Sequence, residues 1–296
     1  MKVLITGANG LLGQKLIALL QTKEGVSLYA TSRGKARILD FKGEYFPLDA
    51  TNKQEVLSLF KRLKPDVVIH TAAMTHVDEC ELHPEDCYVA NVEAVRNVVA
   101  GCEMIDAHMV HLSTDFIFDG TEGPLSEKAV PNPINYYGKT KLEAEEIIKA
   151  SNISSSIART VLVYGVVPGL KRSNIILWVK DNLAKKNSLK IVDDQWRTPT
   201  LAEDLALGCW LLAKDKVKGI YNISGGDMLT PYEMAQLVAT YFNLDNQYIT
   251  RANSATFNQL AKRPPKTGFI IDKAIKKLGY RPHSFKEGIE IIAGQL

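Results

Sequence analysis

The sequence predicts an α/β protein with a doubly wound parallel sheet and a smaller C-terminal portion. Short apolar runs alternate with amphipathic runs over the first 165 residues, and a glycine cluster follows the first apolar run. After about residue 165 the alternation loosens and loops containing Gly and Pro appear. Strands that alternate with helices pair in parallel, because each connection crosses one face of the sheet through a helix.

The expected elements follow from apolar spacing along the chain. In the first part we expect strands at residues 2–6, 27–31, 44–48, 67–70, 109–113 and 156–160, and helices at 11–21, 53–63, 84–105 and 137–150. In the second part we expect a loop at 165–174, helices at 174–186 and near 202–213, 231–242 and 285–293, a strand starting at 189, and a strand at 219–224. We therefore expect one domain at 1–165 and a second portion at 166–296, with weaving of the second back into the first left open.

Composition excludes several classes of protein. With 296 residues, 46 % hydrophobic and 23 % charged, the chain can bury a sizeable core. Its net charge of +3 is weak and its basic residues are dispersed, which gives no reason to expect a nucleic-acid partner. No apolar run approaches the roughly 18 residues of a membrane span, and four cysteines do not suggest a disulfide framework. We expect a cytoplasmic protein without a membrane partner, and a homodimer is left open.

The glycine cluster TGANGLLG, residues 6–13, predicts a dinucleotide site. Gly7, Gly10 and Gly13 lie between the first strand and the first helix. Glycines there allow a tight turn and a close approach of the backbone to a pyrophosphate, and the helix N-terminus attracts the negative charge. We expect a Rossmann-type NAD(P)-binding domain at residues 1–165.

The end of the second strand favours NADPH over NADH. NAD-binding proteins usually place an Asp or Glu there for the ribose 2′-hydroxyl. Here the stretch ATSRGKAR has no acidic residue, and Arg33 lies where the acid would be. A guanidinium suits a 2′-phosphate. We expect NADPH as the cofactor, with NADH tolerated.

A tyrosine and a lysine start the helix at NYYGKTKLEAEE, residues 135–146. Tyr137 and Lys141 are four residues apart and share a helix face, whereas Tyr136 lies about 100° away. A nearby cation is expected to move the pKa of Tyr137 towards neutral pH. The strand that ends at Ser113 and Thr114 adds a hydroxyl at the carboxyl edge of the sheet, where ligands of such sheets bind.

Several motifs together resemble a known family. TGANGLLG, HTAA (70–73), STDFIFDG (113–120), YYGKTK (136–141) and ARTVLVYG (158–165) are similar to the extended short-chain dehydrogenase/reductase family, and within it to the dTDP-4-dehydrorhamnose reductase subfamily. The resemblance covers nearly the whole chain. It implies NADPH-dependent reduction of the 4-keto group of a nucleotide-linked 6-deoxy sugar, with dTDP-4-dehydrorhamnose converted to dTDP-L-rhamnose, and a substrate-binding role for residues 166–296.

The resemblance also implies roles for individual residues. Tyr137 would protonate the carbonyl oxygen, Thr114 would hydrogen-bond it, and Lys141 would bind the nicotinamide ribose. The implied cofactor-binding residues are Gly7, Asn9, Gly10, Leu11, Leu12, Gly13, Arg33, Asp49, Ala50, Ala72, Ala73, Tyr137, Lys141 and Val163. The implied substrate-binding residues are Thr75, Val77, Asp115, Trp196, Arg197 and Arg263, and no metal is implied. RTVL at 159–162 and the late motif containing Arg263 and Thr267 depart from the subfamily pattern, which puts the sugar nucleotide in doubt.

Two other functions stay open. A sugar-nucleotide epimerase uses the same fold, whereas a 4,6-dehydratase of this family has a Glu where this chain has Phe116. A non-catalytic, NADP-binding regulatory subunit similar to the methionine adenosyltransferase beta subunit is the third hypothesis. Fold alone does not decide among these functions.

Some signals are interpreted as structural. His76, Cys80, His83 and Cys87 have helical spacing typical of metal ligands, but Pro84 interrupts that helix and the related family has a loop there. Trp178 is expected in the core. Trp196, in a polar turn, is a candidate for substrate contact, and Arg197 and Arg263 are candidates for the pyrophosphate.

Overall fold

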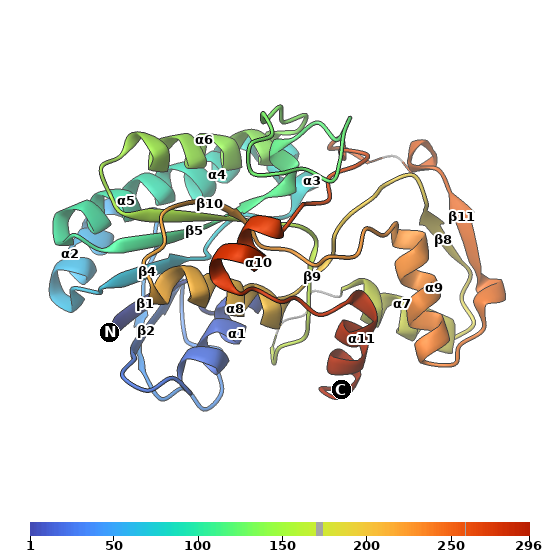
Figure 1. Ribbon diagram of the computed structural model, residues 1–296, viewed down its shortest axis with the longest axis horizontal. Coiled ribbons are helices and arrows are strands. Elements are labelled where there is room, and N and C mark those ends of the chain that lie inside the picture. The colour runs from blue at the N-terminus through green and yellow to red at the C-terminus, as the bar shows by residue number, and fades with distance from the viewer. Residues whose placement is uncertain (170–173, 258) are drawn as a thin grey trace.

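Seven parallel strands form the central sheet of the computed structural model (Figure 1). The structure describes residues 1–169, 174–257 and 259–296, so part of the expected loop at 165–174 lies outside the described residues. The strands are β1 (Lys2–Thr6), β2 (Ser27–Ser32), β3 (Glu44–Pro47), β4 (Val67–His70), β5 (His108–Thr114), β6 (Ser155–Thr160) and β10 (Gly219–Asn222). Their order is β10-β6-β5-β4-β1-β2-β3, and every pairing is parallel. This confirms the predicted fold class.

Helices cover both faces of the sheet because alternate strand residues point in opposite directions. Val3, Ile5 and Ile69 pack towards the face that carries α1 (Leu11–Leu20) and α8 (Ala202–Lys214). Leu4 and Val68 pack towards the face that carries α2 (Lys53–Leu63), α5 (Ala94–Ile105) and α6 (Tyr136–Ala150). Figure 1 shows these two helical layers above and below the sheet.

The strand order reverses between β1 and β4, which places the ligand-binding crevice of such a sheet at their carboxyl ends. The glycine loop follows β1, and β5, which ends at Thr114, lies beside β4. The fold therefore brings the glycine cluster and Thr114 to the same edge of the sheet.

The C-terminal portion has its own core beside this edge (Figure 1). It contains α7 (Ile175–Ala184), β8 (Leu189–Val192), α9 (Pro231–Tyr241), β11 (Ile249–Ala252) and α11 (Phe285–Ala293). A short pair, β7 (Val163–Tyr164) with β9 (Thr200–Leu201), leads into it. Between these elements, α8 packs on the main sheet and β10 pairs with β6, so the chain passes from one portion to the other more than once.

Several elements differ from the prediction. The expected helix at 84–105 consists of α4 (Pro84–Tyr88), a π-helical segment (Val89–Glu93) and α5. The preceding loop contains a further helix, α3 (Val77–Leu82), because His76 caps it by accepting from the backbone N–H of Glu79. The helix α10 (Asp272–Leu278), the strand β11 and short 3₁₀ turns at Asp115–Ile117, Asn246–Tyr248 and Ser254–Thr256 were also not predicted.

The prediction for Trp178 is wrong. Its side chain is 40 % exposed and lines a surface depression with Pro231 and Phe257, because α7 lies at the edge of the C-terminal core. None of the helices in the described residues is both long and apolar enough to cross a bilayer.

Candidate active site

The glycine loop has the close contacts that a dinucleotide site requires. Gly7 has a φ of +71°, and a Cβ there would lie 2.6 Å from the backbone nitrogen of Ala72. A Cβ on Gly13 would lie 2.5 Å from the carbonyl oxygen of Gly7. Helix α1 begins directly after Gly10, whose lack of a side-chain cap leaves the first-turn N–H groups for an anion. The loop therefore fits a pyrophosphate group.

Asn9 ties the glycine loop to the basic loop that follows β2. Its side-chain amide donates to the carbonyl oxygen of Lys35 at 3.0 Å and accepts from the backbone N–H of Arg37 at 2.8 Å. The Tyr45 hydroxyl donates to the carbonyl oxygen of Gly34 at 2.9 Å. Arg33 is exposed in this anchored loop. Its position beside the glycine loop fits a 2′-phosphate.

The other residues implied for the cofactor lie along the same edge. Asp49 uses its carboxylate to cap the turn after β3, accepting from the Thr51 N–H at 3.0 Å and from the Thr51 hydroxyl at 2.8 Å. The carbonyl oxygen of Ala50 accepts from Asn97. The remaining members of this set are Leu11 and Leu12 in the first turn of α1, Ala72 and Ala73 after β4, and Val163 in β7.

Helix α6 brings Tyr137 to Thr114. Asn135 caps the helix by accepting from the Gly138 N–H at 2.8 Å, and its amide donates to the carbonyl oxygen of Lys262. The Tyr137 ring is only 9 % exposed and meets the ring of Phe116 edge-on, with centroids 6.0 Å apart. The Thr114 hydroxyl lies near the phenol and lowers its pKa, while it donates to the Asp115 carboxylate at 3.1 Å. Two of the three residues implied as catalytic are therefore close together.

The protonation of Tyr137 differs from the expectation. Burial raises the pKa of its phenol above the ordinary value, and the nearby Thr114 hydroxyl opposes this shift only in part. Burial also lowers the pKa of Lys141 to about 8. The Lys141 amine lies 3.3 Å from Nε2 of His111. The expected lowering of the Tyr137 pKa by Lys141 is wrong in this structure because burial dominates, and the phenol keeps its proton at neutral pH.

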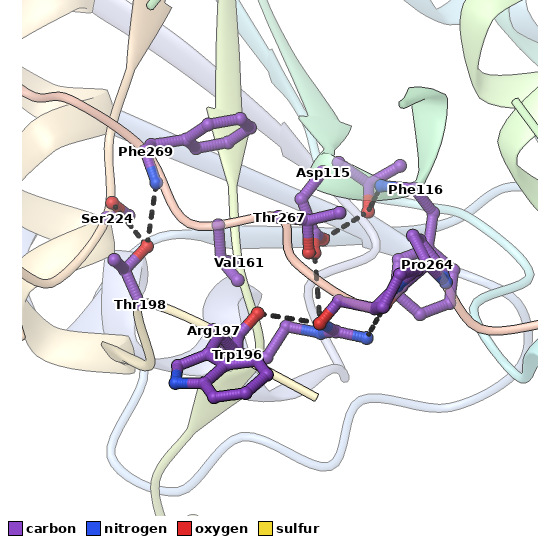
Figure 2. Close-up of polar contacts among 12 residues, drawn as sticks. Asp115, Phe116, Val161, Trp196, Arg197, Thr198, Ser224, Pro264, Thr267 and Phe269 are labelled. Atoms are coloured by element: carbon purple, nitrogen blue, oxygen red, sulfur yellow. Dashed lines mark hydrogen bonds and ion pairs between the residues drawn. The ribbon is translucent and has the colours of Figure 1, made fainter. Parts of the chain in front are cut away.

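Arg197 and Asp115 form a buried cluster with the late loop (Figure 2). The Arg197 guanidinium donates to the carbonyl oxygens of Trp196 at 2.7 Å and Pro264 at 2.6 Å, and its Nε lies 3.8 Å from Asp115. The Thr267 hydroxyl donates to the same carboxylate. The structure thus does not support Arg197 as a pyrophosphate ligand, because backbone carbonyls and Asp115 use its donors. Asp115 is likewise directed into this cluster.

Arg263 forms a bidentate pair with Asp78 in α3. The nitrogen–oxygen distances are 2.5 and 2.7 Å, and the bonds from Arg263 lower the pKa of Asp78 to about 2. The pair links the late loop to the segment that carries Thr75 and Val77. Asp78 was not predicted as a site residue because α3 was not expected. Arg263 therefore has an anionic partner within the protein.

Trp196 presents its ring to the surface. The ring is 37 % exposed, while the backbone N–H donates to the carbonyl oxygen of Pro265 at 2.8 Å and the carbonyl oxygen accepts from Thr267. A fixed backbone with an exposed indole suits contact with a ligand. Figure 2 shows the ring beside Arg197.

The residues with metal-like spacing have other contacts. The His76 ring caps α3, and His83 lies 3.6 Å from Glu79 at the protein surface. Cys80 and Cys87 are buried in an apolar cluster with Tyr137.

Comparison with known proteins gives consistent matches. The family model described as RmlD substrate binding domain matches residues 1–296. A solved dTDP-4-dehydrorhamnose reductase from Clostridium acetobutylicum is 30 % identical, with a TM-score of 0.87 over 100 % of this chain and 99 % of that one. A second, from Bacillus anthracis in complex with NADP, is 26 % identical, with a TM-score of 0.84 over 100 % of this chain and 99 % of that one.

A relative with a different name is also similar. Methionine adenosyltransferase 2 subunit beta from Xenopus tropicalis is 35 % identical over 256 residues, which are 84 % of this chain and 74 % of that protein. Together these matches confirm the resemblance inferred from the sequence motifs. The chain belongs to the RmlD substrate binding domain family.

Proposed function

We propose that the protein reduces the 4-keto group of a nucleotide-linked 6-deoxy sugar with NADPH, and that the substrate is dTDP-4-dehydrorhamnose and the product dTDP-L-rhamnose. The observation that carries the proposal is the buried Tyr137 phenol, which keeps its proton at neutral pH and lies near the Thr114 hydroxyl at the carboxyl edge of β5. Reduction of a ketone needs an acid at the carbonyl oxygen. The related reductases from C. acetobutylicum and B. anthracis support the substrate class.

Each residue of the site has its own role in the proposed reaction. The backbone of the glycine loop would hold the pyrophosphate and Arg33 the 2′-phosphate, while NADPH, when bound, supplies the hydride. The Thr114 hydroxyl orients the carbonyl and Tyr137 donates its proton to the oxygen. Lys141 would hold the nicotinamide ribose, and Trp196 would contact the nucleotide sugar from the surface side.

Phe116 argues against water elimination. Its ring packs edge-on against Tyr137, at the position where a dehydratase would need a carboxylate. Phe116 does not argue against an epimerase, because epimerisation needs no such carboxylate. Product analysis tests this alternative: an epimerase would form an isomer of the substrate without net NADPH consumption.

A regulatory function is the second candidate. The similarity to methionine adenosyltransferase 2 subunit beta favours it. The internal contacts of Arg197 and Arg263 also favour it, because they use guanidinium N–H groups that would otherwise be free to bind a nucleotide. Under this hypothesis the protein binds NADP and a methionine adenosyltransferase but reduces nothing. The protonated Tyr137 phenol near the Thr114 hydroxyl is the reason for preferring the reductase.

The test is NADPH consumption with a panel of dTDP-, UDP- and GDP-linked 4-keto sugars. We expect one NADPH consumed per alcohol formed with the dTDP sugar. Tyr137→Phe is expected to lower kcat by roughly 10²–10⁴ while NADPH still binds, and Lys141→Ala to lower both turnover and cofactor affinity. The matched control is Tyr136→Phe, which should cost little. No turnover with any sugar, together with binding to a methionine adenosyltransferase, would establish the regulatory function instead.

Compartment and assembly belong to the same proposal. The four cysteines are buried and free, which suits a reducing cytoplasm. A homodimer is proposed as well, and light scattering of the purified protein tests it.

A further inference from the structure

Two buried histidines lie beneath the start of helix α6. His70 in β4 and His111 in β5 are register partners, so their side chains lie on the same face of the sheet. Their rings stack with centroids 5.7 Å apart and planes inclined by 16°. Both are at most 1 % exposed. Apolar side chains would fill this layer without burying polar ring nitrogens, so the imidazoles call for an explanation.

The polar contacts of the pair point in two directions. Nδ1 of His70 lies 2.7 Å from the hydroxyl of Thr6, the residue before the glycine loop. Nε2 of His111 lies 3.3 Å from the Lys141 amine. Among the described residues, His70 Nε2 and His111 Nδ1 have no hydrogen-bond partner. The rings are therefore held at one end by Thr6 and meet Lys141 at the other.

We propose that His111 is a positioning residue for Lys141: Nε2 of its neutral ring accepts a hydrogen bond from the Lys141 ammonium, and His70, anchored by Thr6, keeps the His111 ring in place by stacking. The inference rests on the proposed function, which gives Lys141 its role. A lysine has a flexible four-carbon stem, so a fixed acceptor is needed to hold its ammonium in one place.

The neighbouring charges fit this role. Glu145, the acid one turn further along α6, is occupied by a bidentate pair with Arg159 at 2.9 and 2.6 Å. Cys87 from α4 also faces the ammonium. An imidazolium at His111 would repel the ammonium, but burial keeps the pKa of His111 well below its ordinary value. Burial likewise lowers the pKa of His70 to about 3. The stacked pair is therefore neutral at neutral pH and can accept.

The first test needs no variant. Nitrogen NMR of ¹⁵N-histidine-labelled full-length protein at pH 7, without cofactor, reports the tautomer of each ring. We expect the His111 ring to carry its proton on Nδ1, with an unprotonated Nε2 that accepts a hydrogen bond. A proton on Nε2, or an imidazolium, would overturn the proposal, because neither form can accept from the ammonium.

The second test compares His111→Leu with His111→Gln. The two side chains are similar in size, but only Gln keeps an acceptor near the position of Nε2. With ¹³Cε-labelled lysine, the Lys141 signal is identified by its absence in Lys141→Met. A hydrogen bond to a charged group corresponds to roughly one to two pKa units. We expect His111→Leu to lower the Lys141 pKa by about that amount and His111→Gln to keep it near the parent value. Equal values in both variants would contradict the proposal. Should His111→Leu not fold, the tautomer of the parent protein decides alone.

Kinetics separate this inference from the proposed function. If turnover occurs, His111→Leu should lower NADPH affinity and kcat together, and His111→Gln should restore both. Turnover that is equally impaired in the two variants would refute the positioning role while leaving the reductase intact. If no sugar is reduced but the tautomer and the lysine titration are as expected, the contact stands and the proposed function fails.

Discussion

Replacing Lys141 with methionine should make the protein more stable at neutral pH. The Lys141 side chain is 3 % exposed and lies between helix α6 and the sheet. Burial of its ammonium lowers the pKa from 10.5 to about 8. Methionine is similar in length, unbranched and uncharged, so it fills the same space without a buried charge. Active-site residues are often kept for function at a cost in stability, so replacing one of them typically stabilises the protein.

The size of the effect follows from the pKa. Each pKa unit corresponds to about 1.36 kcal/mol, so the shift from 10.5 to about 8 represents about 3 kcal/mol of lost stability. Below pH 8 the lysine is charged in both folded and unfolded chains, and this cost is fully present. Between pH 8 and 10.5 the unfolded chain binds more protons, so the parent gains stability as the pH rises. Loss of the hydrogen bond to His111, at roughly one pKa unit or about 1.4 kcal/mol, offsets part of the gain.

The assay is urea unfolding of parent and variant at several values between pH 7 and 10.5. We expect Lys141→Met to be about 2 kcal/mol more stable at pH 7, and this difference to fall by about 3 kcal/mol across the range. Lys139→Met, on the exposed side of the same helix, is the control for the general effect of losing a lysine. Parallel stability curves for parent and Lys141→Met between pH 8 and 10.5 would refute the reasoning.

Three further predictions concern other buried or charged groups. Burial lowers the pKa of His108 from 6.5 to about 4. The parent should therefore lose up to about 1.4 kcal/mol of stability per pH unit as the pH falls from 6.5 to 4, and His108→Asn should not show this loss. Urea midpoints of both proteins at pH 7 and 5 test this. Arg159→Met leaves the buried Glu145 with only the more distant cation Lys149, at 3.4 Å, and should cost about 3 kcal/mol in urea unfolding. Much of this loss should be recovered by Arg159→Met/Glu145→Leu, and equal stability of the single and double variants would count against it. Arg33→Ala should weaken NADPH roughly ten- to hundredfold in fluorescence titrations and spare NADH; equal losses for both cofactors would argue against a 2′-phosphate contact.

The sheet was predictable because its signals are local. Each strand of the first part is a short apolar run, and parallel pairing follows from the helices between them. The glycine spacing likewise identified positions at which a Cβ has no room, as Gly7 and Gly13 show. The helix α3 was missed because its start depends on a histidine cap, which propensity rules do not favour.

Side-chain pairings between distant segments were not predictable from the sequence. Arg197 was expected to bind a pyrophosphate because a guanidinium offers bidentate donors, whereas here Pro264 and Trp196 present carbonyl oxygens to it. The partner of Arg263 lies 185 residues away in the chain. Such contacts depend on how loops from both portions of the fold meet, and residue spacing carries no information about that.

The Tyr136–Tyr137 pair shows how far periodicity alone reaches. A turn of about 100° per residue separates the two side chains, and only Tyr137 shares a face with Lys141. In the structure the Tyr137 ring is buried against Phe116 and its phenol lies near Thr114, while the backbone N–H of Tyr136 donates to Glu81. The spacing thus selected the tyrosine that reaches the sheet edge. It did not anticipate that the Lys141 ammonium would meet His111, because that contact depends on the distance between a helix and a strand. Burial then decides the protonation of both residues, and a protonated phenol one helical turn before a lysine held by a neutral acceptor is the state in which Tyr137 can act as an acid.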